Sequence, residues 1–258
     1  MDVIHYNEKM LPMQDLETIG LASGGQLLLN VDDLKALLSG RRTGLMQLQN
    51  LEAENIKIKS MDAKVSLKPD ADGKINLMIH PVYKKPATPS FLDDNEAEKL
   101  EKGEVANYFK TTTDDKGNKK ELLVEYDAET REFIISDTEK ILAPDMVNLQ
   151  FLTAAQKENY RKGKEVTLPD KTTFGFSATD THGIRANKLA LVASILIDGG
   201  LTYVVYKGLN MLFNQKRNEV DAAKLSPGYY HAVQDAAESQ NPRVANQMNR
   251  TYTRGGSR

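Results

Sequence analysis

The chain has 258 residues and a formal net charge of −2, so it has no overall attraction to nucleic acid or to anionic lipid. It contains no Cys, which excludes disulfides, thiolate metal sites and cysteine nucleophiles and fits a reducing compartment. Its four His lie at positions 5, 80, 182 and 231, which offers no paired-histidine metal spacing. We therefore expect no metal and no cofactor. The N-terminus lacks the basic and apolar regions of a secretory signal, so we expect a cytoplasmic protein.

Residues 1–83 are expected to form a small domain of two helices and an antiparallel sheet. Apolar residues between 11 and 20 recur at helical spacing, and Asn30 is the expected N-cap of a second helix that ends at Gly40. From Leu45 to Val82 the apolar period changes to two, and turn residues at 69–73 predict a hairpin between the last two strands.

One segment of the sequence occurs twice. After an expected Pro-rich linker at 84–90, the pattern Phe91-Leu92-x5-Glu98-x-Leu100-x-Lys102-Gly103 returns, without a gap, as Phe151-Leu152-x5-Glu158-x-Tyr160-x-Lys162-Gly163. This repetition predicts two tandem helix–β-hairpin units, at 91–150 and 151–185. Each unit is too small to hold a core alone, so we expect the two to pack on each other or on a neighbour.

The C-terminal part is expected to hold an apolar helical segment at 186–217 and a polar, partly disordered tail at 218–258. Residues 189–206 approach the length of a membrane-spanning helix, but Asp198 and two glycines interrupt them. Two buried helices, a partner-binding hairpin and membrane association all remain open. The candidate partner or membrane surface consists of Leu191, Ile195, Leu196, Val204 and Val205.

Two groups of arginines are candidate contacts for anions or nucleic acid. Arg41 and Arg42 lie between glycines, where two guanidiniums could hold a phosphate or carboxylate, or could instead satisfy the end of the preceding helix. The tail holds the other group, which is Arg243, Arg250, Arg254 and Arg258. These four could contact a nucleic-acid backbone, or could simply keep the tail soluble.

The sequence indicates no catalytic residues. Asp180 and His182 lie near Ser177 and Ser194, but no nucleophile-elbow motif accompanies them, so we interpret residues 180–183 as a turn. The Asp-x-Asp-Gly pattern at 70–73 is better explained by a hairpin turn than by a calcium loop. We therefore expect a protein that is not an enzyme.

Several motifs resemble known families. The first set is Leu16-Glu17-x-Ile19-Gly20, Asp33-Leu34-x-x-Leu37-Leu38-x-Gly40-Arg41-Arg42-Thr43, and Asp62-Ala63-Lys64-Val65-Ser66-Leu67 with Ile79-His80-Pro81. It resembles an uncharacterised N-terminal domain family found mainly in Bacteroidetes, often on conjugative or integrated mobile elements. The motif Leu152-Thr153-x-x-Gln156-Lys157-x3-Arg161-x-Gly163-Lys164-x-Val166 resembles an uncharacterised family of short repeats. The resemblance implies a bacterial cytoplasmic origin and a mobile-element context, and it transfers no activity.

These observations predict an α+β protein that acts as a non-enzymatic structural or adaptor protein binding other proteins. Two alternatives remain from other classes. One is a membrane-anchored component of a conjugative transfer or exclusion apparatus, and the other is a nucleic-acid-binding accessory factor.

Overall fold

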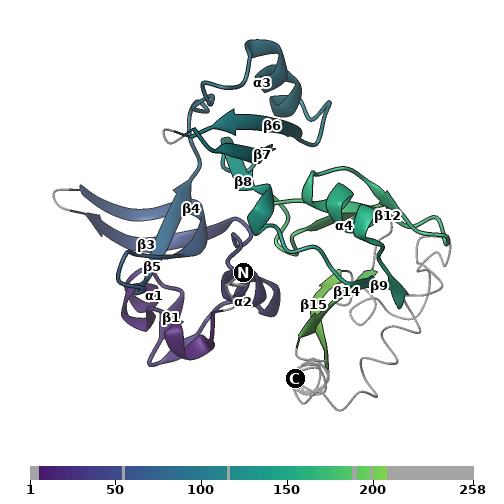
Figure 1. Ribbon diagram of the computed structural model, residues 1–258. Coiled ribbons are helices and arrows are strands. Elements are labelled where there is room, and N and C mark those ends of the chain that lie inside the picture. The colour runs from purple at the N-terminus through teal and green to yellow at the C-terminus, as the bar shows by residue number, and fades with distance from the viewer. Residues whose placement is uncertain (1–5, 54–55, 115–116, 188–190, 198–199, 208–258) are drawn as a thin grey trace, which may run out of the picture. The chain divides into compact units, whose positions relative to one another are not determined.

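The computed structural model describes residues 6–53, 56–114, 117–187, 191–197 and 200–207. The chain is α+β, with short helices and antiparallel strands in several small sheets, as predicted (Figure 1). It divides into two compact units: residues 1–142 with 177–184, and residues 143–176 with the chain from 185 onward. The domain boundaries drawn from the sequence stay a prediction.

The N-terminal region begins with short helices and one small hairpin. Its helices are η1 (Glu8–Met10), α1 (Met13–Thr18) and α2 (Val31–Leu38), and its hairpin joins β1 (Ala22–Ser23) to β2 (Gln26–Leu27). Asn30 caps α2 as expected, because its side-chain oxygen accepts a 2.8 Å hydrogen bond from the Asp33 amide. Gly40 follows α2 with a φ of +69°, a conformation that favours glycine at a helix end.

A three-stranded antiparallel sheet completes this region. Its strands, in spatial order, are β3 (Met46–Ala53), β4 (Ile56–Pro69) and β5 (Ile75–Pro81). Alternating apolar residues of the sheet pack with the helices around fully buried Leu16, Leu37, Leu48 and Val65. The neighbours of β4 cover different halves of it: β3 pairs with residues 56–63 and β5 with residues 63–69.

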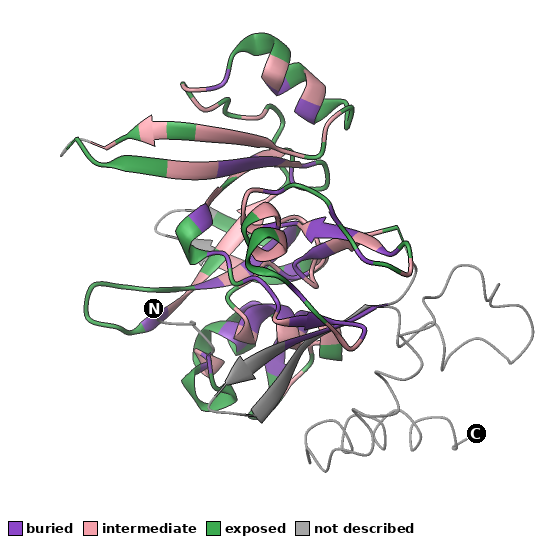
Figure 2. Ribbon diagram, turned by 45° about the vertical axis from the view of Figure 1, so that its right-hand side comes forward, coloured by how far each residue is buried: buried purple, intermediate pink, exposed green. Residues whose placement is uncertain are grey.

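The first predicted copy contains one helix and a second three-stranded sheet. These elements are α3 (Asp94–Glu101), β6 (Tyr108–Thr113), β7 (Lys119–Asp127) and β8 (Glu132–Asp137), with η2 (Thr138–Lys140) after them. Leu92, just before the helix, and Leu100 within it pack against Val124 and Phe133 of the sheet. Figure 2 shows the exposed residues of α3 on the side that faces away from this sheet.

The second predicted copy repeats this order with shorter strands. Its elements are α4 (Ala154–Arg161), β11 (Val166–Thr167), β12 (Thr173–Phe176) and β13 (Ile184–Ala186). Tyr160 of the helix packs on Phe174 and Phe176, with ring centroids 6.1 and 6.0 Å away. Before α4, β9 (Met146–Val147) and β10 (Gln150–Phe151) form a hairpin that the sequence analysis did not foresee.

Corresponding positions of the two copies have the same local structure. Asp93 with Glu96, and Thr153 with Gln156, form capping boxes at the starts of α3 and α4. The helices end at Lys102 and Lys162, followed by glycines with φ of +68° and +70°. Each Lys pairs with the Glu four residues before it, at 2.6 and 3.0 Å. The shared Leu, Glu, Lys and Gly residues are thus buried contacts, helix-surface pairs and helix ends, whereas Phe151 lies in β10 and is 68% exposed. The interpretation as a true repeat stays a prediction.

The predicted apolar helical segment is wrong where the structure describes it. Residues 191–197 and 200–207 form the strands β14 (Leu191–Ile197) and β15 (Gly200–Lys207), which pair antiparallel in the sheet β10-β9-β14-β15. Val, Ile, Thr and Tyr dominate these residues, and such side chains fit a pleated sheet better than a helix. Residues 208–217 and the predicted tail lie outside the described residues. Across the part of the chain that is described, no helix has the length and apolar character needed to cross a membrane.

Candidate functional site: a charged joint in the first unit

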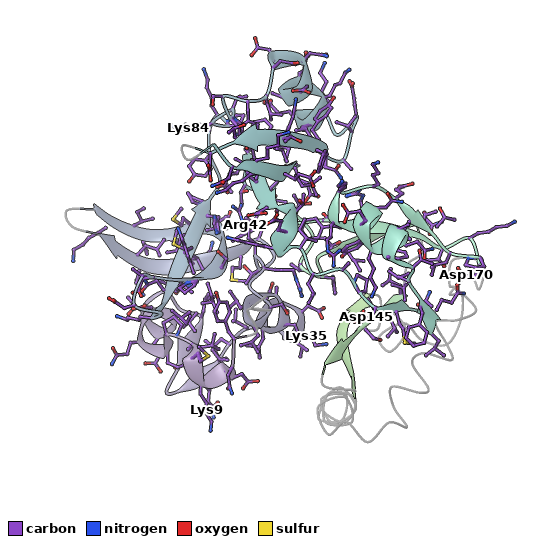
Figure 3. The ribbon with its side chains drawn as sticks, in the orientation of Figure 1. Lys9, Lys35, Arg42, Lys84, Asp145 and Asp170 are labelled. Carbon is purple, nitrogen blue, oxygen red and sulfur yellow. The ribbon has the colours of Figure 1, made fainter. Side chains whose placement is uncertain are left out.

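The two arginines predicted as an anion site are both engaged within the first unit. Arg42 Nη1 lies 2.5 Å from Glu132 Oε2 at the start of β8, and both side chains are largely buried. Figure 3 labels Arg42 in the region where the N-terminal sheet meets this strand. Arg41 Nε donates a 2.9 Å hydrogen bond to the carbonyl oxygen of Thr181. Each guanidinium therefore contacts a segment that lies far along the sequence, and no bound anion is needed to explain it.

Arg42 belongs to a larger cluster of charged and polar side chains, which we call the charged joint. Its cationic and imidazole side chains come from the N-terminal region, and its carboxylates come from the end of β7, the start of β8 and the turn between them. Its members are Arg42, Lys64, His80, Asp127, Glu129 and Glu132.

Lys64 is the centre of the charged joint. Lys64 is only 1% exposed, and its Nζ lies 2.8 Å from both Asp127 Oδ2 and Glu129 Oε2. The neighbours Ala63 and Val65 belong to the core of the N-terminal region, so Lys64 takes the opposite face of β4. A buried ammonium needs charged partners, and the turn after β7 supplies two of them.

The turn that carries the carboxylates is fixed by its own backbone. Asp127 Oδ1 accepts hydrogen bonds from the amides of Glu129 and Thr130, at 3.1 and 3.4 Å. Arg131 takes a φ of +56° and Asp127 pairs with Glu132, which closes a tight connection between β7 and β8. The Tyr83 amide, just beyond β5, donates to the Thr130 carbonyl at 2.9 Å. The amides of the turn therefore hold the Asp127 carboxylate beside Lys64.

His80 sits beside Lys64 on the paired strand β5. Its Nε2 is 2.8 Å from Ser66 Oγ, and its Nδ1 is 3.6 Å from Glu132 Oε2. Burial, and then the nearby Arg42 guanidinium, lower the pKa of His80 from 6.5 to about 4, against the opposing effect of the Glu132 and Asp127 carboxylates. The imidazole is thus neutral at pH 7.

Serine, histidine and glutamate in this order suggest a hydrolytic triad, but the geometry favours a structural role. The 3.6 Å separation of Nδ1 from the carboxylate is too long for a hydrogen bond, and an imidazole with a pKa of about 4 is a weak general base. Ser66 also lies inside a regular strand rather than on a sharp turn that would present its hydroxyl. The three side chains fit the packing of two strands and a turn.

We expect the charged joint to favour one docked arrangement rather than to add net stability. Removing two charges from water costs about as much as their attraction returns, so a buried pair adds little net stability. Leaving one member without its partner costs about 3–5 kcal/mol, because an uncompensated charge stays buried. An arrangement that keeps Lys64 or Asp127 buried without the other is therefore strongly disfavoured.

The predicted turn at 180–183 is a second segment that contacts the N-terminal region. These residues belong to the connection between β12 and β13, where Asp180 Oδ1 lies 3.1 Å from His182 Nδ1. The same imidazole has its Nε2 3.8 Å from Asp32 Oδ1. Ser177 Oγ instead pairs with Thr179 Oγ1 at 3.0 Å, so no described serine is bonded to His182. This geometry agrees with the turn interpretation.

Arg41 and Gly183 fit closely at this turn. Gly183 has a φ of +73°, and a Cβ on it would lie 2.9 Å from the Cδ of Arg41. Any other residue here would be strained and would displace the arginine. The Ala178 amide also donates to Glu125 Oε2 of β7 at 2.6 Å. The connection at 177–183 is therefore held both by the N-terminal region and by the first predicted copy.

Arg41 and Arg42 contact similar places in the two predicted copies. Arg42 contacts Glu132, the first residue of β8, directly after the connection between the second and third strands of the first copy. Arg41 contacts the connection between the second and third strands of the second copy, β12 and β13. Two consecutive residues thus bind corresponding connections. Gly40, which ends α2, places both side chains where the chain leaves the helix.

Most of the other predicted site residues lie outside the part of the chain whose side chains are described. Leu191 in β14 is fully buried. Ile195, Leu196, Val204 and Val205 lie in β14 and β15, and their side chains are outside the described part. Arg243, Arg250, Arg254 and Arg258 also fall outside the described residues. Within the described ranges, no group of three or more His, Asp or Glu side chains could hold a metal ion.

Sequence reasoning missed most of the charged joint. Lys64 alternates with apolar residues, and this pattern ordinarily places a lysine on a solvated sheet face. The available signal was the group of three acids in six residues at Asp127, Glu129 and Glu132, directly after an apolar strand. Only the fold shows that these acids meet Lys64, which lies about sixty positions earlier.

The fold and the charged joint define an α+β N-terminal domain that carries a neighbouring helix-and-sheet segment on a cationic face. Residues 6–90 match the family model described as "Protein of unknown function (DUF4099)". An uncharacterised domain therefore lies at the N-terminus. Comparisons with curated proteins and with solved structures give no match. Arg42, Lys64 and His80 lie inside the matched range, whereas Asp127, Glu129 and Glu132 lie beyond it.

Proposed function

We propose that this protein is a non-enzymatic structural or adaptor protein that binds other proteins, in which the N-terminal domain holds the first helix-and-sheet segment and the connection at 177–183. The observation that carries the proposal is the paired use of Arg41 and Arg42 on corresponding strand connections. Side chains used in this way serve the relative placement of parts rather than a reaction. Reused supersecondary units commonly build extended binding surfaces.

The resemblance of the N-terminal motifs suggests the setting of this adaptor. We place it in the cytoplasm of a bacterium and in a mobile-element system, because the resembling families occur there. The partner we expect is another protein of such a system.

Co-purification tests the proposal directly. The full-length chain, tagged and expressed at native level in a bacterial host, is isolated under mild conditions and analysed by size-exclusion chromatography and mass spectrometry. We expect a stoichiometric complex with another protein. Recovery of free monomer only, or of nucleic acid in place of protein, would contradict the proposal.

Two charge-removing variants sharpen this experiment. Arg42→Gln breaks a largely buried contact of the charged joint, so we expect it to lower recovery of the complex. Lys9→Gln removes an equal charge from an exposed position in η1, so we expect it to leave recovery unchanged. Equal recovery with both variants would show that partner binding does not depend on the charged joint.

A further inference from the structure

Among the described strands, none pairs with the first half of β4 on one side. Residues 56–62, which we call the open edge, pair with β3 except at Lys59, but β5 begins its pairing at Ala63. In Figure 1 the β3–β4 ribbon projects past the end of β5. A continuation of β5 would have covered the open edge. The chain turns away instead, and the Tyr83 amide bonds to Thr130.

The backbone groups of Ser60 point toward the uncovered side. Gln49 is the partner of Ser60 on β3, yet its amide donates to the Ile19 carbonyl at 3.1 Å, away from β4. The Gln49–Ser60 pair is therefore a non-hydrogen-bonded pair of the antiparallel ladder, in which both residues direct their N–H and C=O groups outward. Alternation gives Ile58 and Asp62 the same direction.

An independent contact supports this assignment. The carbonyl of Val65 accepts from the Thr43 amide, and its amide donates to Thr43 Oγ1, each at 2.9 Å. Because Thr43 leads into β3, the odd-numbered residue Val65 directs its groups to the β3 side. The even-numbered residues of β4 then face the other side, in agreement with Ser60. The open edge is thus a row of backbone donors and acceptors of the kind that a further strand requires.

The side chains at the open edge are accessible. Residues 57–60 are all exposed, and Ile58 retains 37% of its surface. Lys57 and Lys59 alternate with Ile58 and Ser60 along the strand. Lysines on an edge strand oppose pairing with another copy of the same strand, because they bring like charges together.

The possible registers show which pairings of the open edge with a second copy the lysines disfavour. In a two-fold antiparallel pairing that uses all of residues 56–62, Lys59 lies opposite the same residue of the second copy. A shift of two residues in either direction leaves five paired residues, and the shift toward the start of β4 places Lys57 opposite Lys59. Like charges directly opposite are destabilising, so the full-length self-pairing and one of the two shifted ones are disfavoured, whereas a strand with a carboxylate opposite Lys59 is attracted.

We propose that the open edge of β4 binds an extended segment of another protein as an added antiparallel strand, with an acidic side chain opposite Lys59. The proposal rests on the proposed adaptor function and names its contact surface. Backbone hydrogen bonds from Ile58, Ser60 and Asp62 supply affinity, and the side chain of Lys59 supplies selectivity.

Defined peptides test the proposal on the full-length chain. The probe is a fluorescent peptide of about nine residues that alternates valine and glutamate, and the matched probe has lysine in place of glutamate. We expect the glutamate probe to bind about tenfold more tightly in fluorescence anisotropy at low salt, and to slow hydrogen exchange of the Ser60 amide. Equal binding of the two probes, or binding of neither, would overturn the proposal.

Three variants make the test specific. Ser60→Pro removes one outward N–H without removing a bond to β3, and should weaken binding about tenfold, whereas Ser60→Ala keeps the backbone and should bind normally. Lys59→Glu should reverse the preference between the probes. Circular dichroism and thermal melting confirm that each variant folds. Normal binding by folded Ser60→Pro would place the probe elsewhere and refute the proposal.

The outcome separates this inference from the adaptor function. If the natural partner co-purifies with Ser60→Pro as well as with the unchanged chain, the adaptor function stands and the open edge is not its contact. If sedimentation shows a dimer of the unchanged chain that Ser60→Pro dissociates, the occupant is a second copy and the proposal is wrong.

Discussion

The two predicted copies build the same capped helix, but their strand connections are held in different ways. In the first copy, a short turn presents carboxylates to Lys64 and Arg42 through charged contacts. In the second, a longer connection offers the Thr181 carbonyl to Arg41. Local sequence is thus enough to specify each helix, whereas the attachment of each connection depends on a few side chains of the N-terminal domain. Changing those side chains tests whether attachment and local structure are separable.

The largest effect is expected at Lys64. Replacement by Met leaves Asp127 buried without its cation, so the free energy of unfolding should fall by about 3–5 kcal/mol in urea denaturation. The double variant Lys64→Met with Asp127→Asn removes both charges, keeps an oxygen for the Glu129 and Thr130 amides, and should recover much of that loss. A loss below about 1 kcal/mol for the single variant would show that the charged joint does not secure the first connection.

Arg42→Gln and Arg41→Gln compare the two attachments directly. Arg42→Gln should cost about 2–3 kcal/mol, because Glu132 loses a charged partner, and Arg41→Gln about 1 kcal/mol, because Thr181 offers a neutral carbonyl. Hydrogen exchange should accelerate at residues 128–131 in the first variant and at 177–183 in the second. The same exchange pattern in both variants would mean that the connections are not attached separately.

His80 makes the first attachment sensitive to pH. Its folded-state pKa of about 4 lies below the unfolded value of 6.5, so the unfolded chain binds the proton more readily. The stability contributed by the neutral imidazole is complete above pH 6.5 and is lost as pH falls from 6.5 to 4. Solvent screening at this partly exposed ring limits the loss to about 2 kcal/mol.

The matched variant for this effect is His80→Gln, which cannot titrate. Denaturation between pH 4 and 7 should show a shallower pH dependence for the variant than for the unchanged chain. Parallel curves for the two proteins would assign the pH dependence to carboxylates elsewhere.

The smallest effects are expected at the helix caps, where the copies should behave alike. Asp93→Ala and Thr153→Ala each remove an N-cap side chain that accepts a bond from the third helical residue. Each should lower the free energy of unfolding by about 1 kcal/mol and accelerate exchange in the first turn of its own helix. A difference between them of more than about 1 kcal/mol would count against equivalent local structure.

Much of the fold followed from short-range patterns in the sequence. Alternation at Ala63, Val65 and Leu67 predicted the buried face of β4, and Asn30 predicted the start of α2. The segment at 191–207 shows where such patterns fail, because its run of apolar residues has no clear period and its length suggested a helix. Its β-branched and aromatic residues indicated strands more reliably than its length did.

The charged joint could not be predicted by the same means. A strand pattern fixes which face Lys64 occupies, but not what covers that face. That information lies in the turn at 127–132, and no local rule links two segments so far apart in sequence. The sequence identified Arg41 and Arg42 as contacts either for an anion or for the end of the preceding helix, whereas the structure shows both in contact with distant parts of the chain.

The adjacency of Arg41 and Arg42 has a consequence for how this protein can change during evolution. Two attachments depend on consecutive residues, so one inserted or deleted amino acid beside them would put at least one guanidinium out of register with its target. Point substitutions at the two sites are separable events, but length changes are not. We therefore expect lineages to keep the number of residues between α2 and β3 even where Arg41 or Arg42 itself is replaced.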